Sequence, residues 1–420
     1  MPARRLRLSH RLPWDAPWNR LARAVAERAA RGLETIDLTL SNPTRADLPY
    51  PVAELAEILG RAALPDYPPH PLGLPEAREA LAAALSLPED PVTPADLVLT
   101  ASTSESYSHL FKLFADPGRE VLTAVPSYPL LDSLTALDGL VLRHFPLEPG
   151  RRFALDPGEL ERALSSRTRL LVLVHPGNPT GAFLSAAEQD AVARLCAERR
   201  LPLVSDEVFA DYPLTGSEAG IGRHAGPAAA RADILSFSLG GLSKSAGLPS
   251  WKLGWIRVGG PAAERRRAIA ALELIADTYL SVATPVQRAL PDLLALAPRI
   301  RAAILERLRD NLKSLRAALA GLPAVELIEP HAGWSAVVRV PRLRADEDLA
   351  VDLLNDAGVL VHPGHLFDFA AEGYLVLSLL PQPSLFAHGL DRLAGHLGAT
   401  ISGGAAPPAT SSPPPSPPRR

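Results

Sequence analysis

The lysine in the segment SFSLGGLSKSAGLPSWKLGW, residues 236–255, could act as a nucleophile. A run of small residues follows an apolar stretch and presents Lys244 in a predicted loop. A lysine held in a confined pocket loses hydration, and its neutral amine is then suited to Schiff-base chemistry. Because most lysines are solvated surface charges, this segment alone does not establish a catalytic role.

A second segment, LVSDEVFADY at residues 203–212, contains a short apolar strand that ends in Asp206. A carboxylate such as Asp206, at the carboxyl end of a buried strand, points into the ligand crevice of a parallel sheet. There it can keep a pyridine nitrogen protonated, which makes the ring of pyridoxal 5'-phosphate (PLP) an electron sink. A helix cap is the alternative interpretation, because a predicted helix follows Asp206.

Two further segments supply neutral hydrogen-bonding groups. LVHPGNPTG, residues 173–181, places Asn178 after a third apolar stretch, where its amide can donate to the ring oxygen of PLP. Asn-Pro-Thr-Gly can also be only a turn. Ser102, Thr103 and Ser104 lie between a predicted strand and a predicted helix, where free N–H groups and hydroxyls suit a phosphate. A serine N-cap accounts for one of these three residues but not for all of them.

The elements that must position these side chains are those of an α/β domain. Short, continuous apolar runs predict strands buried on both faces of a mostly parallel sheet. These runs lie at residues 96–101, 120–125, 170–174, 201–206, 233–238 and 253–258. Helical patterns separate them, and a long helical stretch at about 261–320 leads to the strand and helix patterns of a smaller α+β domain.

Length and composition limit the organisation and the partners. A chain of 420 residues exceeds one hydrophobic core, so we expect two domains with a cleft between them. The predicted divisions are an N-terminal arm with part of the small domain at 1–50, the large cofactor-binding domain at 51–290, the C-terminal small domain at 291–400 and a disordered Pro/Ser-rich tail at 401–420.

The charge and the apolar runs exclude several classes of partner. The net charge of −3 gives no basic field for nucleic acid. No signal-peptide pattern begins the chain, and no apolar run approaches the roughly 18 residues of a membrane span. The single cysteine and the histidine spacing suit no metal site. We therefore expect a cytoplasmic protein with neither a nucleic-acid nor a membrane partner.

With these four segments in this order, the chain resembles the class I/II aminotransferases, PLP-dependent enzymes of fold type I related to aspartate aminotransferase. The resemblance runs from about Leu38 to Leu397 and includes DYPPHPLGLPEAREAL, VPSYPLL, HAGWSAV and HPGHLF. It implies a large domain with a mostly parallel sheet, a smaller α+β domain and a homodimer with shared active sites. The implied reaction moves an amino group from an amino acid or amine to a 2-oxo acid.

The resemblance also implies roles for matching residues. Lys244 matches the Schiff-base lysine, which also shuttles the substrate's α-proton. Asp206 matches the partner of the ring nitrogen, and Asn178 matches the donor to the ring oxygen. Tyr128 matches an aromatic residue stacked on the ring. Tyr67 matches a tyrosine that reaches the phosphate of the neighbouring subunit's cofactor.

Three positions around the cofactor depart from the family pattern. Lys252 replaces an arginine that grips the phosphate, so the charge is kept but the fork geometry is lost. Gly241 replaces a phosphate-binding serine. Phe209 replaces a tyrosine that donates to the ring oxygen. Loss of that tyrosine donor is expected to raise the pKa of the imine formed by Lys244. Tyr212 is an alternative donor.

The departure with the largest consequence is Val376 in GYLVLSLL, where the family has an arginine for the substrate α-carboxylate. A buried valine cannot pair with a carboxylate. Ser41 and Arg45, in LSNPTRADLPYP, are candidate substrate-binding residues, although Arg45 can equally be a solvated loop residue. The missing arginine leaves a PLP-dependent lyase or decarboxylase open as an alternative. A PLP-sensing transcription regulator is disfavoured, because the single helix predicted near the start is too short for a helix-turn-helix.

Overall fold

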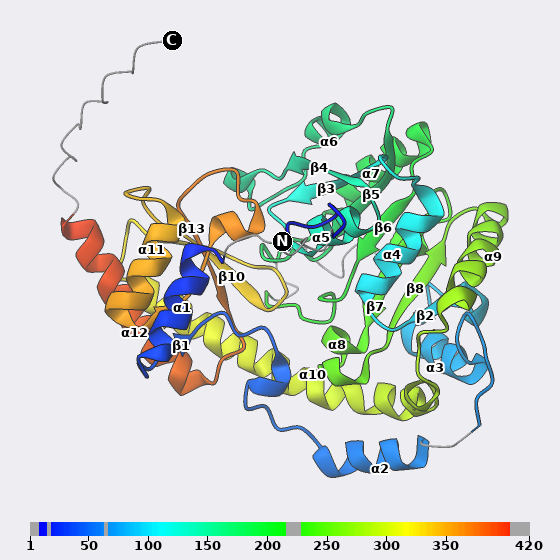
Figure 1. Cartoon of the computed structure of the whole chain (residues 1–420), viewed down its shortest axis with the longest axis horizontal. Helices are drawn as coiled ribbons and strands as arrows, with labels where there is room; N and C mark the ends of the chain where they lie inside the picture. The colour runs from blue at the N-terminus through cyan, green and yellow to red at the C-terminus, as the bar shows by residue number, and fades with distance from the viewer. Residues whose placement is uncertain (1–7, 15–17, 63–65, 216–227, 404–420) are drawn as a thin grey trace, which may run out of the picture.

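The computed structural model describes residues 8–14, 18–62, 66–215 and 228–403 (Figure 1). A seven-stranded sheet with the order β2-β8-β7-β6-β5-β3-β4 forms the larger part of the molecule. Its strands are Leu97–Thr100 (β2), Glu120–Val125 (β3), Val141–Pro146 (β4), Thr168–Val174 (β5), Leu203–Asp206 (β6), Ser236–Gly241 (β7) and Gly254–Gly259 (β8). Strand β8 runs antiparallel to β2 and β7, and the other neighbouring pairs are parallel. The prediction of a mostly parallel α/β sheet is confirmed.

Helices cover both faces of this sheet, as the continuous apolar character of its strands requires. They are Pro75–Leu85 (α3), Thr103–Phe114 (α4), Leu130–Leu137 (α5), Pro157–Ala163 (α6), Ala186–Arg199 (α7), Leu242–Ser245 (α8) and Ala262–Tyr279 (α9). One apolar cluster joins sheet residues such as Val98 and Phe237 to Phe111 of α4 and Leu272 of α9. Another joins other sheet residues to Val192 and further residues of α7.

The second part of the molecule is built around a four-stranded antiparallel sheet with the order β12-β13-β10-β9. Its strands are Glu326–Ile328 (β9), Ser335–Arg339 (β10), His362–Pro363 (β12) and Tyr374–Ser378 (β13), and its helices are Arg20–Ala30 (α1), Asp346–Asp352 (α11) and Pro383–Gly403 (α12). Strand β1 (Ile36–Asp37) pairs in parallel with β11 (Val359–Leu360). The N-terminal segment therefore joins the C-terminal part of the chain.

Helix α10 (Thr284–Leu319) runs along both parts of the molecule, and α2 (Val52–Ala62) packs against it (Figure 1). The predicted start of the small domain at residue 291 thus falls inside a continuous helix. Single turns of 3-10 helix occur at Pro43–Arg45 (η1), Pro94–Asp96 (η2), Pro149–Arg151 (η3), Ala228–Ala230 (η5), Pro249–Trp251 (η6) and Gly364–Phe367 (η8), and a π turn occurs at Leu353–Ala357 (η7).

Several predicted elements differ in detail from the structure. Strand β4 was not predicted, because it lies at the sheet edge and its exposed positions break the continuous apolar pattern. The helical stretch predicted at about 261–320 is two helices, which are separated at Leu280, a residue with a left-handed φ of 44°. Helix α12 reaches Gly403, beyond the predicted start of the tail at 401. Residues 404–420 of that tail lie outside the described residues.

Candidate active site

A cleft of about 350 Å³ opens where the carboxyl ends of β5 and β6 face the second part of the molecule. The predicted site residues that line it are Ser41, Ser102, Thr103, Ser104, Tyr128, Asn178, Asp206, Lys244 and Lys252. Its volume lies within the ordinary range for a small-molecule site. The structure therefore brings residues from six separate sequence segments to one place.

Asp206 is the last residue of β6, and its side chain is buried in the cleft wall. Its Oδ2 accepts a hydrogen bond from the hydroxyl of Tyr107 at 2.8 Å, and its Oδ1 accepts one from the backbone N–H of Val208 at 3.2 Å. Burial raises the pKa of Asp206, whereas these two hydrogen bonds and the charge of Lys244 act in the opposite direction. The carboxylate is thus held on both oxygens, and only 8% of the residue is exposed.

Lys244 lies on the single turn α8, where the sequence predicted a loop. Its Nζ is 4.8 Å from the centroid of the Trp334 ring and 5.8 Å from that of Phe209. Burial lowers the pKa of Lys244, and the nearby charge of Asp206 opposes that change. The amine is therefore shifted toward the neutral, nucleophilic form.

The hydroxyl of Tyr212 supports the backbone at this lysine. It donates to the carbonyl oxygen of Lys244 at 2.5 Å, and the Tyr212 side chain is fully buried. The sequence had suggested Tyr212 as a replacement donor for the tyrosine missing at Phe209. In the structure its hydroxyl is used to hold the short turn that carries the lysine.

The N-terminus of α4 forms another wall of the cleft. The hydroxyl of Ser102 caps the helix by accepting from the backbone N–H of Glu105 at 3.2 Å. Thr103 and Ser104 occupy the first two helical positions, whose N–H groups have no acceptor within the helix. A helix start of this kind attracts an anion. Ser102 thus serves the helix as a cap, and the following residues can face an anionic ligand.

The backbone around Gly241 leaves little room for the serine that the family often carries there. A Cβ atom at this position would lie 3.3 Å from both the carbonyl oxygen of Leu253 and the Cα of Gly254. Both neighbours are backbone atoms, which shift less readily than a flexible side chain. The close approach of β7 and β8 therefore disfavours a side chain at this position.

Three residues singled out from the sequence lie away from the cleft lining. Tyr67 is 58% exposed. Arg45 is exposed on η1, four residues after Ser41. Val376 is 2% exposed and belongs to an apolar cluster with Phe153 and other residues. Apolar side chains therefore enclose the position at which the family usually has an arginine.

Sequence reasoning missed other residues of the lining. Tyr107 contacts Asp206, and Trp334 contacts Lys244. The cleft is also lined by Ser243, Ser335 and Ser378. Tyr107 could have been found, because it lies one helical turn after Thr103 and so shares its face of α4. The contribution of Trp334 depends on the packing of the two parts of the molecule, for which the sequence carries no local signal.

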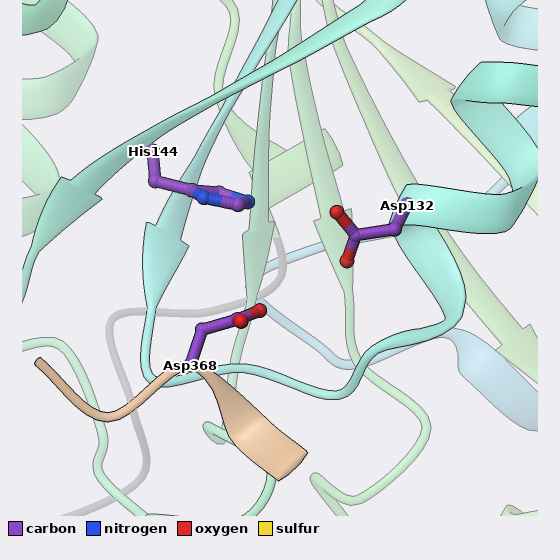
Figure 2. Close-up of side chains that lie close together, drawn as sticks. All are labelled: Asp132, His144 and Asp368. Atoms are coloured by element: carbon purple, nitrogen blue, oxygen red, sulfur yellow. The ribbon is translucent and has the colours of Figure 1, made fainter. Parts of the chain in front are cut away.

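A separate group of potential metal ligands lies at the surface. Asp132 of α5, His144 of β4 and Asp368, which follows η8, point toward one another, with ligand atoms all within 4.8 Å (Figure 2). All three side chains are exposed. Exposed groups of this kind are common without an ion, so we assign no metal to this cluster.

The donor set of the cleft fits PLP. A buried carboxylate suits the ring nitrogen, an amine of lowered pKa suits the aldehyde, and the start of α4 with Lys252 suits the phosphate. The fold and this cleft together define a PLP-dependent enzyme of fold type I.

The chain belongs to the aminotransferase class I and II family, whose model matches residues 36–386. It is 30% identical to the aspartate/prephenate aminotransferase of Thermus thermophilus over 376 residues, covering 89% of this chain and 93% of that protein. It is 26% identical to the alanine aminotransferase of Mycobacterium tuberculosis, covering 93% and 96%. The structure of an alanine aminotransferase from Pyrococcus furiosus superposes with a TM-score of 0.84 at 22% identity, covering 93% of this chain and all of that one.

These findings make the chain a PLP-dependent aminotransferase that acts on amino and 2-oxo acids. They do not favour the lyase or decarboxylase alternative. Among the described residues, no helix is long and apolar enough to cross a membrane.

Proposed function

We propose that Lys244, Asp206 and Asn178 form the reacting centre of this aminotransferase, with the start of α4 and Lys252 as its phosphate site. The observation that supports this most is the meeting of a desolvated lysine and a buried carboxylate in one cleft, beside a helix N-terminus. Groups with pKa values perturbed in this way are concentrated at catalytic sites.

PLP, when bound, supplies an electron sink for the charge that forms as a substrate loses its α-proton. Asp206 would accept a hydrogen bond from the protonated ring nitrogen, because its two donors hold both carboxylate oxygens in place and leave lone pairs free. Asn178 donates from its amide to the ring oxygen. The amine of Lys244 takes the α-proton and returns it, a role that its lowered pKa favours. Tyr128 covers the ring with its aromatic face.

The proposed substrates are 2-amino acids with uncharged side chains. Apolar residues form much of the cleft wall, and they include Leu130, Val208 and Trp334. The only cationic side chains among the described lining residues are Lys244 and Lys252, which we assign to the cofactor. Ser41 and Arg45 are proposed to bind the substrate carboxylate from the rim, in place of the arginine replaced by Val376.

We further propose a homodimer in which Tyr67 reaches the phosphate of the neighbouring subunit's cofactor. Large apolar side chains are unusually exposed on α2 and α9: Val52 is 70% exposed, Leu274 is 73% exposed and Tyr279 is 53% exposed. A second copy of the chain would cover such surfaces, because monomeric proteins seldom expose large apolar patches. The proposed location of this dimer is the cytoplasm.

The test is a single turnover of the purified holoenzyme with a panel of amino acids and amines. We expect amino acids with uncharged side chains to convert PLP to pyridoxamine phosphate, with one equivalent of the matching 2-oxo acid detected by mass spectrometry. The Lys244→Ala variant should lose both the absorption of lysine-bound PLP and this conversion. Turnover that releases ammonia or carbon dioxide without aminated cofactor would contradict the proposal, and so would conversion by amines alone.

A further inference from the structure

Tyr107 is a buried polar residue of the cleft to which the family resemblance assigns no role. Its side chain is 2% exposed and belongs to the apolar cluster that contains Val98, Leu110 and Phe111. Its hydroxyl reaches Asp206 at 2.8 Å, across 99 positions of sequence. The ring is therefore anchored in the core, while the single polar atom of the side chain is directed at the site.

The hydrogen bond from Tyr107 restricts the Asp206 carboxylate in a way that the backbone alone does not. The N–H of Val208 holds Oδ1, and the tyrosine hydroxyl holds Oδ2. Two donors on different oxygens fix the rotation of the carboxylate, whereas one donor would leave it free to turn. Each oxygen keeps a second lone pair that can accept from a ligand in the cleft.

Helix α4 carries both this hydroxyl and the proposed phosphate site. Thr103 begins the helix, and Tyr107 lies four residues later on the same face, about 6 Å along the axis. The helix packs on β8 and α9, so its position is set by the large sheet. One rigid element thus presents groups to both the phosphate region and the carboxylate of the cleft.

We propose that Tyr107 is a positioning residue that holds the Asp206 carboxylate toward the ring nitrogen of PLP, so that α4 secures both ends of the cofactor. This inference rests on the proposed assignment of Asp206 to the ring nitrogen. It concerns cofactor binding first and turnover second, because Tyr107 acts through Asp206.

The experiment is a double-mutant cycle on cofactor affinity. The equilibrium release of PLP from the holoenzyme is measured for wild type, Tyr107→Phe, Asp206→Asn and the double variant, with the absorption of lysine-bound PLP as the signal. Tyr374→Phe is the matched control, since it removes a buried tyrosine hydroxyl from β13 outside the cleft lining. Loss of a hydrogen bond to a charged group should raise the PLP dissociation constant about tenfold or more in Tyr107→Phe.

The cycle separates positioning from general packing. In the Asp206→Asn background, Tyr107→Phe should cause little further loss of affinity, because the charged acceptor is already absent. An equal loss in both backgrounds, or a Tyr107→Phe affinity that matches that of Tyr374→Phe, would overturn the inference. If Asp206→Asn itself binds PLP as tightly as wild type, the assignment of Asp206 in the proposed function is wrong as well.

Discussion

The free energy of unfolding of the wild-type enzyme is expected to fall as the pH rises, because the buried Glu207 becomes ionised. Replacing Glu207 by glutamine should prevent this fall. Glu207 follows Asp206 directly, and its Oε1 accepts hydrogen bonds from the Ser238 hydroxyl at 2.8 Å and from the Ala228 backbone N–H at 2.9 Å. Burial raises the pKa of Glu207 from 4.5 to about 7. The glutamine amide oxygen can accept the same two hydrogen bonds without carrying a charge.

The sign and size of the effect follow from this pKa. Since the folded-state pKa of Glu207 lies above its unfolded value, its contribution to stability is complete below pH 4.5 and is lost as the pH rises through about 7. The interval between these two values, at about 1.4 kcal/mol per pH unit, corresponds to a loss of up to roughly 3 kcal/mol. Glu207→Gln should therefore gain stability relative to wild type between pH 5 and pH 8.5.

Urea unfolding of both holoenzymes at pH 5 and pH 8.5 measures this change directly. Glu326→Gln on β9 is the control, because its side chain is 54% exposed and its surface ion pair with Arg339 contributes little. A stability difference between Glu207→Gln and wild type that is the same at both pH values would refute the reasoning. A pH-dependent difference of equal size in Glu326→Gln would do so too.

Substitutions at three further positions test the site. Phe209→Tyr should lower the pKa of the Lys244 Schiff base by restoring a donor to the ring oxygen; an absorbance titration that gives no decrease contradicts this. Lys252→Ala should raise the PLP dissociation constant about tenfold relative to wild type. Lys252→Arg should lower that constant through bidentate contact with the phosphate. If equilibrium titrations give both variants the affinity of wild type, Lys252 is not part of the phosphate site. Arg45→Ala should raise KM for amino donors more than it changes kcat, and an unchanged KM would show that another group binds the carboxylate.

The principal strands and the chemical groups of the site could be predicted from local patterns. Continuous apolar runs identify strands buried on both faces, and polar residues that end such strands meet at one edge of a parallel sheet. Asp206 ends β6, Asn178 lies four residues after the end of β5, and the structure places both in the cleft. Strand β4 escaped prediction because an edge strand lacks that apolar continuity.

The sequence by itself determined which reactive groups this protein has: one lysine after a small-residue strand, one carboxylate at a strand end, and hydroxyls at a helix start. Only the tertiary structure decided what surrounds them. The hydroxyl of Tyr107 meets Asp206, Trp334 covers Lys244, and Val376 is enclosed in an apolar cluster. These contacts join residues far apart in the chain, and their formation depends on strand order and helix packing, which the local periodicity of a sequence does not encode.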